Sequence, residues 1–383
     1  MNKYNFDEIN NRRNTNSVKW DVKDNELPMW VADMDFKVLP EIKAAIKKRS
    51  ELDSYGYIDI PKDYFSSYRY WYKNRHSLDI KEDEMVYVSG VVAGIDSIFK
   101  HLLHKGDGVI VMTPVYHIFY NCIKNNGLKQ FDNEFIYRDG KYEIDFDSLE
   151  SLAKKDEVKA LLLCNPHNPI GRLFSSEELA KIAKICENYG VFIISDEIHG
   201  DIVKPGKEYV SILKISDKAV ALVSPSKTFN IAGLQAACIF VKDQKLKEKI
   251  ETAVGQDDIG EPNYFSPFAT IAAYTYGEKY VNELNEYIFN NKQYIQEYLK
   301  KYLPHLHLID NDATYLLWLD ISYYKMDGKE FANRLREETG LYVSNGNQFG
   351  KGGDSFIRIN IATSLANIKE ACKRLQLFVS KLN

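Results

Sequence analysis

The stretch of sequence that decides the fold reads Val220-Ala221-Leu222-Val223-Ser224-Pro225-Ser226-Lys227. Its apolar half is typical of a strand buried on both faces, as in a parallel sheet covered by helices. Similar apolar runs are expected to form strands at 84–88, 109–112, 160–163, 191–194 and 237–240. Helical patterns alternate with several of these runs, and that alternation predicts an α/β fold with a mainly parallel sheet.

Two of the helices between these strands have recognisable ends. One is expected to begin near Val91 and to stop at Gly106, since glycine suits the left-handed residue that follows many helices. The other begins after Ser175, which forms a capping box with Glu178, and ends before Gly190.

The last third of the chain has a different pattern. Apolar residues between 281 and 299 fit one long amphipathic helix that ends before Pro304. Two further helices are expected, one over 328–339 with Asp327 as its N-cap and one starting at Ser364. Strands are expected at 315–319, 341–344 and 356–361.

These patterns predict two domains without a low-complexity linker between them. The large domain, 46–280, holds the mainly parallel sheet, and the small α+β domain covers 281–383. An N-terminal segment, 1–45, is expected to join the small domain.

Composition excludes several classes of protein. The chain has 383 residues, and its 50 Lys and Arg against 54 Asp and Glu leave a net charge of −4. This balance gives no basic surface for nucleic acid or for an anionic membrane. No apolar run approaches the ~18 residues of a transmembrane helix, and residues 1–8 do not read as a signal peptide. We therefore expect neither nucleic acid nor membrane as a partner.

The cysteines indicate a reducing compartment. They are far apart and form no C-x-x-C pair; the five are Cys122, Cys164, Cys186, Cys238 and Cys372. This predicts reduced, buried thiols in a cytoplasmic protein. His101 and His104 share a helical face, but no third ligand is recognisable nearby, so no metal is expected.

Polar residues follow the predicted strands at the edge where ligands bind in open α/β sheets. They lie in the segments 89–90, 113–116, 164–169, 195–199 and 224–227. Together these segments bring a lysine, an aspartate, an asparagine, a histidine and an aromatic residue to one edge. Gly90 also precedes a helix whose N-terminal N–H groups and dipole suit an anion. The pattern predicts a site for an anionic cofactor.

On these segments the chain resembles the fold-type I pyridoxal 5′-phosphate (PLP) enzymes, the aspartate aminotransferase superfamily. Within it, the chain is similar to the MalY/PatB-type cystathionine β-lyases, a branch of carbon–sulfur lyases. The branch-level similarity lies in residues 17–21, 27–36, 55–57, 195–199 and 224–230, and the superfamily-level similarity in 168–171 and 358–360. The resemblance covers nearly the whole chain and implies a PLP-dependent transferase-like fold.

The resemblance implies a role for each residue that surrounds the ring of PLP. Lys227 would hold the cofactor covalently and, once displaced by substrate, would take the Cα proton. Asp196 would keep the pyridine nitrogen protonated, which makes the ring an electron sink. Asn168 and His199 would bind the phenolic oxygen, although many relatives have tyrosine in place of His199. Tyr116 would stack on the ring.

The remaining roles concern the phosphate and the substrate. The Gly90 and Val91 amides would bind the phosphate, with the hydroxyls of Ser224 and Ser226 nearby. Tyr57 resembles a tyrosine that reaches the phosphate of a neighbouring subunit, which implies a homodimer. Arg358 would hold the substrate α-carboxylate, a bidentate task suited to guanidinium. A list of these candidates therefore contains Tyr57, Gly90, Val91, Tyr116, Asn168, Asp196, His199, Ser224, Ser226, Lys227 and Arg358.

The chain departs from the superfamily pattern in two places. Val91 stands where relatives often have a hydroxyl residue, so it offers the phosphate only a backbone donor. No second arginine is recognisable for a distal carboxylate, which argues against dicarboxylic amino acids.

The predicted activity is β-elimination from L-cystathionine or related cysteine S-conjugates to thiol, pyruvate and ammonia. A PLP-dependent aminotransferase uses the same lysine and is the main alternative. A regulatory, protein-binding role is a minor one. Residues 224–227 also match the S-x-x-K motif of serine β-lactamases, but the chain lacks the accompanying S-D-N and K-T-G motifs.

Overall fold

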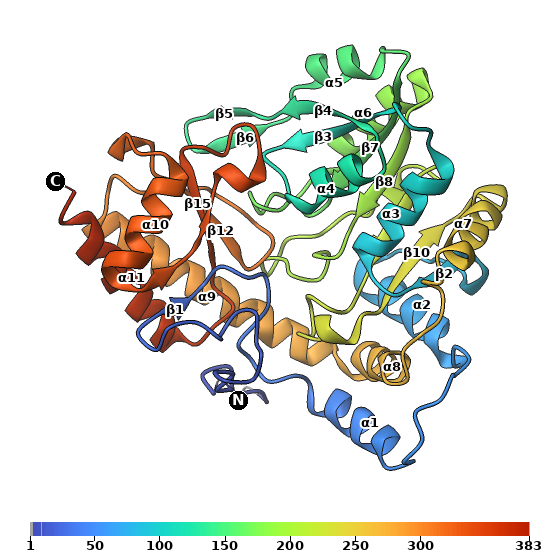
Figure 1. Ribbon diagram of the computed structural model, residues 1–383, viewed down its shortest axis with the longest axis horizontal. Coiled ribbons are helices and arrows are strands. Elements are labelled where there is room, and N and C mark those ends of the chain that lie inside the picture. Colours follow the sequence, from blue (N-terminus) through green and yellow to red (C-terminus); the bar gives the residue numbers. More distant parts are fainter. Residues whose placement is uncertain (1–2, 9, 383) are drawn as a thin grey trace.

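The computed structural model describes residues 3–8 and 10–382, and a seven-stranded sheet forms its larger part (Figure 1). The strands, in spatial order, are β2 (Met85–Val88), β10 (Ala237–Val241), β9 (Val220–Val223), β8 (Phe192–Asp196), β7 (Val158–Cys164), β3 (Gly108–Thr113) and β4 (Lys129–Glu134). Only β10 runs antiparallel to its neighbours in this described sheet. This confirms the predicted α/β class with a mainly parallel sheet.

Helices cover both faces of the sheet, because alternate strand residues point to opposite sides. Leu161 and Leu163 of β7 belong to one apolar cluster, and Leu162 belongs to another. The first face is covered by α2 (Asp63–His76), α5 (Phe146–Ala153), α6 (Ser176–Tyr189) and α8 (Ser266–Tyr276). The second is covered by α3 (Val91–Leu102), α4 (Ile118–Asn125) and α7 (Gln244–Gln256).

A smaller sheet lies at the other end of the molecule (Figure 1). Its strands, in order, are β11 (His307–Leu308), β12 (Leu316–Asp320), β15 (Phe356–Asn360) and β14 (Ser344–Asn345), and its helices are α10 (Gly328–Thr339) and α11 (Leu365–Val379). The long helix α9 (Glu278–Tyr302) connects the two ends. The capping box at Ser175 and the N-cap at Asp327 are both present.

The N-terminal segment contacts both parts of the molecule. Its strand β1 (Leu27–Pro28) pairs in parallel with β13 (Leu341–Tyr342), whereas α1 (Pro40–Ser50) packs on α8. A separate hairpin is formed by β5 (Ile136–Arg138) and β6 (Lys141–Glu143). The predicted domain boundaries remain a prediction.

Two local predictions need correction, and one strand has no counterpart among the predictions. Helix α3 ends at Leu102 rather than at Gly106, because Leu103 is already extended; Gly106, with φ of 94°, forms a later turn. The expected strand 341–344 is two short strands that pair with different partners, β1 and β15. Strand β4 was not predicted because it is a polar strand at the sheet edge, where one side faces solvent.

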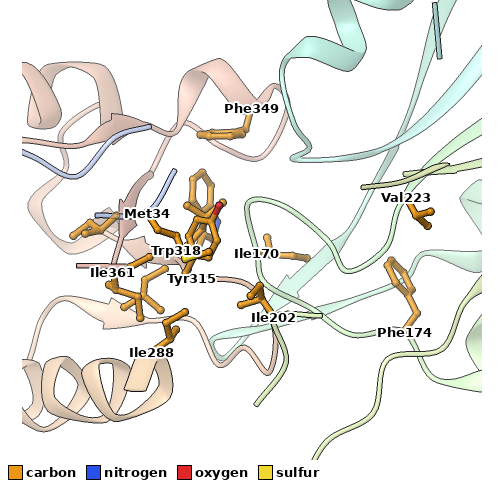
Figure 2. Close-up of a cluster of buried hydrophobic side chains, with 14 of the residues drawn as sticks. Met34, Ile170, Phe174, Ile202, Val223, Ile288, Tyr315, Trp318, Phe349 and Ile361 are labelled. Carbon is orange, nitrogen blue, oxygen red and sulfur yellow. The ribbon is translucent and has the colours of Figure 1, made fainter. Parts of the chain in front are cut away.

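One apolar core joins the two sheets (Figure 2). Met34 of the N-terminal segment belongs to the same cluster as Trp318 and Tyr315, and Ile170 and Ile202 extend this cluster toward the large sheet. Within the described ranges, none of the helices has the length and apolar character to cross a membrane. The shared core places the small sheet and the N-terminal segment against the ligand-binding edge of the large sheet.

Candidate active site

A cavity of about 320 Å³ lies at the carboxyl ends of the large sheet's strands. Its volume falls in the range of small-molecule clefts, about 300 to 1,000 Å³. Nine of the eleven predicted residues line it: Gly90, Val91, Tyr116, Asn168, Asp196, His199, Ser224, Ser226 and Lys227. They come from the segments that follow β2, β3, β7, β8 and β9, so the strand-end argument identified the residues that meet here.

The other two predicted residues lie outside this cavity. Arg358, on β15, is buried behind it, and its guanidinium donates to Asn168 Oδ1 (3.0 Å) and to the carbonyl of Trp30 (2.9 Å). Tyr57 is 99% exposed and projects from a segment away from the cavity of its own chain.

One end of the cavity is suited to an anion. Residues 89–93, where α3 begins, form its wall, so the unpaired N–H groups of the first helical turn are close by. A Cβ added to Gly90 would meet no atom within 4 Å, because the space in front of it is open. Ser224 Oγ donates to the Ala236 carbonyl (2.6 Å) and lies 2.8 Å from Ser226 Oγ.

Asp196 provides the acidic group of the cavity. It ends β8 and is 4% exposed, and burial raises the pKa of its carboxyl to about 7. Two interactions lower this pKa in part. The N–H of Ile198 donates to Asp196 Oδ1 (3.1 Å), and the positive charge of Lys227 is nearby. A protonated ring nitrogen placed beside this carboxylate would stabilise its charged form.

Lys227 is the only lysine or arginine among the described residues that line the cavity. Its Nζ donates to the backbone carbonyl of Ala32 (2.8 Å). Burial lowers the pKa of the amine, and the charge of Arg358 adds to this effect, while Asp33 and Asp196 oppose it. A lowered pKa leaves more neutral amine at neutral pH, and the neutral amine is the nucleophile and the base.

His199 and Tyr116 are neutral, and Arg358 behind the cavity is charged. Burial lowers the pKa of His199 to about 3, so its imidazole is uncharged, and its Nδ1 has no partner in the described part of the chain. Burial raises the pKa of Tyr116 to about 12. Arg358 remains a cation at neutral pH, since burial lowers its pKa only to about 10.

The loop that carries Asn168 requires glycine at position 171. Gly171 has φ of 66°, and a Cβ there would lie 2.2 Å from Asn311 Nδ2 and 2.7 Å from the carbonyl of Ala313. Any side chain would therefore be strained and would collide with the segment before β12. This close approach explains why glycine stands at the end of the 168–171 segment.

Sequence reasoning missed the part played by residues 30–36, although this segment carries branch-level similarity. On the side of the large sheet, the side chain of Asn230 accepts a hydrogen bond from Met34 N (3.1 Å) and donates one to Met34 O (2.9 Å). On the side of the small sheet, the side-chain amide of Asn360 donates hydrogen bonds to the carbonyls of Val31 (2.5 Å) and Asp33 (2.6 Å). These contacts join distant positions, so no local pattern predicts them.

The fold and the site define a cofactor-dependent enzyme of the α/β class. A family profile described as aminotransferase class I and II matches residues 26–375. The chain therefore belongs to this family.

The chain is similar in sequence and structure to several carbon–sulfur lyases. The chain is 35% identical to cystathionine β-lyase PatB of Bacillus subtilis, over 98% of this chain and 100% of that protein. It superposes on cystalysin of Treponema denticola, which contains a pyridoxal 5′-phosphate cofactor, with a TM-score of 0.95 and 33% identity over 99% and 100% of the two chains. The chain superposes on the PLP-bound C–S lyase of Staphylococcus hominis with a TM-score of 0.92 and 33% sequence identity, over 98% of each chain.

The chemistry of the cavity fits PLP. An acid able to face the ring nitrogen, a lysine, and a set of neutral donors for the phosphate occur in one cavity. Together with the family and the PLP-containing relatives, this confirms the predicted cofactor. In the described ranges, no three His, Cys, Asp or Glu side chains are grouped to hold a metal ion.

Proposed function

We propose that this protein is a PLP-dependent carbon–sulfur β-lyase that acts on L-cystathionine or related cysteine S-conjugates. The site supplies two groups that the proposed reaction requires: a cavity lysine with a lowered pKa, and a buried arginine bonded to Asn168 on the cavity wall. An aminotransferase would use the same two groups, so the choice of a lyase is carried by sequence similarity. Similarity to cystathionine β-lyases and C–S lyases over the full length supports the lyase reaction.

Arg358 would bind and orient the substrate. Its guanidinium is buried, and Nε has no partner among the described residues. A substrate α-carboxylate would satisfy this fork with two parallel hydrogen bonds. Binding there directs the Cα of an L-amino acid toward the cavity that contains Lys227.

Lys227 would move the proton. When bound, PLP withdraws electrons from the substrate Cα, which lowers the barrier to breaking the Cα–H bond. The Lys227 amine takes that proton, and Asp196 keeps a proton at the pyridine nitrogen. The electron pair left at Cα forms the second bond between Cα and Cβ as the Cβ–S bond breaks. The electrons of the Cβ–S bond leave with the sulfur as a thiolate. The Lys227 ammonium can then protonate the thiolate, and water converts the released 2-aminoacrylate to pyruvate and ammonia.

The test is product analysis of the purified protein with PLP and L-cystathionine, without a keto acid acceptor. We expect catalytic amounts of pyruvate, ammonia and homocysteine. Turnover that begins only when a keto acid is added would instead identify an aminotransferase, which is the second candidate because the matched family carries that name. No reaction with or without acceptor would contradict both.

We also propose that the protein is a homodimer in which Tyr57 reaches the phosphate site of the other subunit. Tyr57 is 99% exposed and Tyr55 is 57% exposed, so both side chains are free to contact a second subunit. Tyr57→Phe should weaken PLP binding in the dimer without changing its mass in solution. A monomeric holoenzyme would contradict the proposal.

The cysteines support a cytoplasmic location, which we propose as well. All five are free and buried, as suits a reducing compartment. We further propose the domain limits 1–45, 46–280 and 281–383, with the first segment joining the small domain; limited proteolysis tests whether cleavage falls near them.

A further inference from the structure

The backbone carbonyl of Ala32 accepts hydrogen bonds from two directions. Lys227 Nζ donates to it from the large domain (2.8 Å), and the hydroxyl of Tyr315 donates to it from the small sheet (3.1 Å). Both lone pairs of this carbonyl are therefore used. The three residues are separated by 195 and 283 positions in the sequence, so the meeting point is a product of the tertiary fold.

Tyr315 can only donate at this position. Its side chain is fully buried in the apolar core that also contains Met34 and Trp318 (Figure 2). Burial raises the pKa of its phenol far above the ordinary value, and the charge of Asp33 adds to the rise. The phenol therefore stays protonated and cannot compete with Lys227 as a base. Its ring also meets the edge of His199, with centroids 6.0 Å apart.

The residue before Tyr315 is held in a strained conformation. Thr314 has φ of 64°, which is rare for a β-branched residue. Its N–H donates to the carbonyl of Ile202 (2.8 Å), and its Oγ1 accepts from the N–H of Leu316 (3.1 Å). Such strain persists only where surrounding contacts impose it, and it is found preferentially at functional sites. Here it fixes the direction in which Tyr315 leaves the start of β12.

We propose that Tyr315 is a positioning residue that fixes the Ala32 carbonyl, so that this carbonyl orients the free amine of Lys227 for proton transfer at the substrate Cα. The inference rests on the proposed function only in taking Lys227 as the base. It requires the Cα–H bond to break with its proton going to Nζ, a step shared by lyases and aminotransferases.

The decisive variant is Tyr315→Phe, which removes one hydroxyl and keeps the ring. The measurement is exchange of the Cα proton of L-alanine in D₂O by the holoenzyme, followed by NMR. L-Alanine has no leaving group at Cβ, so exchange reports proton transfer whether or not the enzyme eliminates. We expect the saturated exchange rate to fall by about 2- to 12-fold, the range that one neutral hydrogen bond contributes. The half-saturating L-alanine concentration and the PLP content should be unchanged.

The matched control is Tyr280→Phe. Tyr280 is 1% exposed and also donates to a backbone carbonyl, that of Lys37 (3.0 Å), but Lys37, unlike Ala32, does not line the cavity. It should leave the saturated exchange rate at the wild-type value. Equal saturated rates for Tyr315→Phe and the control would overturn the inference.

A crystal structure of cofactor-free Tyr315→Phe, in which the Lys227 amine is free, gives a readout that does not depend on activity. The inference expects Lys227 Nζ and the Ala32 carbonyl to move beyond hydrogen-bond distance. An unchanged 2.8 Å contact would contradict it. Failure of the proposed lyase function would appear separately, as absence of pyruvate from L-cystathionine while L-alanine exchange still falls in the variant.

Discussion

The two walls of the cavity are built in different ways. The cofactor wall comes from one sheet, where Asp196 ends a strand and Lys227 follows the next one within four residues. The substrate wall is supported from behind by contacts between distant segments: Arg358 reaches the carbonyl of Trp30 across 328 positions, and Tyr315 reaches that of Ala32 across 283. The first wall follows from a topological rule about strand ends. The second follows only from tertiary packing.

The largest expected effect tests the cofactor wall. Lys227→Ala should reduce β-elimination by about 10²- to 10⁴-fold, the usual contribution of a general base. The fold should survive, because the side chain ends in the cavity and makes one hydrogen bond. The rate of pyruvate release and the thermal unfolding midpoint check this. Lys242→Ala is a control, since its Nζ also donates to a backbone carbonyl (2.8 Å); comparable losses in both variants would contradict the assignment.

An intermediate effect tests the substrate wall. Arg358→Lys keeps the charge but loses the fork that bonds Asn168 and Trp30. We expect kcat/KM to fall by about 10- to 100-fold, because hydrogen bonds to a charged group contribute about 1.5–3 kcal/mol. Initial rates over a range of L-cystathionine concentrations measure this. The exposed Arg334→Lys should change nothing, and unchanged kinetics for Arg358→Lys would place the carboxylate elsewhere.

The smallest expected effect is a pH dependence of the cofactor-free protein. The pKa of Asp196 is raised from 3.8 to about 7 on folding, so its contribution to stability falls as pH rises through that interval. The pKa of His199 is lowered from 6.5 to about 3, so its contribution falls as pH drops through that interval. Each group changes the free energy of unfolding by at most ~1.4 kcal/mol per pH unit.

The two slopes have opposite signs, and single variants separate them. Between pH 4.5 and 6, stability should rise more steeply with pH in Asp196→Asn than in the wild type, and fall more steeply in His199→Gln. Urea unfolding at several pH values measures both. Parallel curves for all three proteins would show that neither group is buried as described.

The cofactor wall was the predictable part of the site. Gly90, Asp196 and Lys227 follow apolar runs, so their positions at one edge follow from the parallel sheet, and the family resemblance adds their roles. Ala32 and Tyr315 carry no such signal, because an alanine carbonyl and one of 26 tyrosines are unremarkable in a sequence. The fold was predictable on the same terms. Buried strands were found, but the polar edge strand β4 was missed and the end of α3 was placed too far along.

Both walls meet at Lys227, so the most direct test of the account is to locate the cofactor's attachment. Hydride reduction of the PLP-loaded protein fixes the cofactor to the lysine that holds it, and peptide mapping by mass spectrometry identifies that residue. The account predicts the cofactor mass on the peptide that contains Lys227 and on no other. Attachment to a different lysine, with Lys227 unmodified, would contradict it.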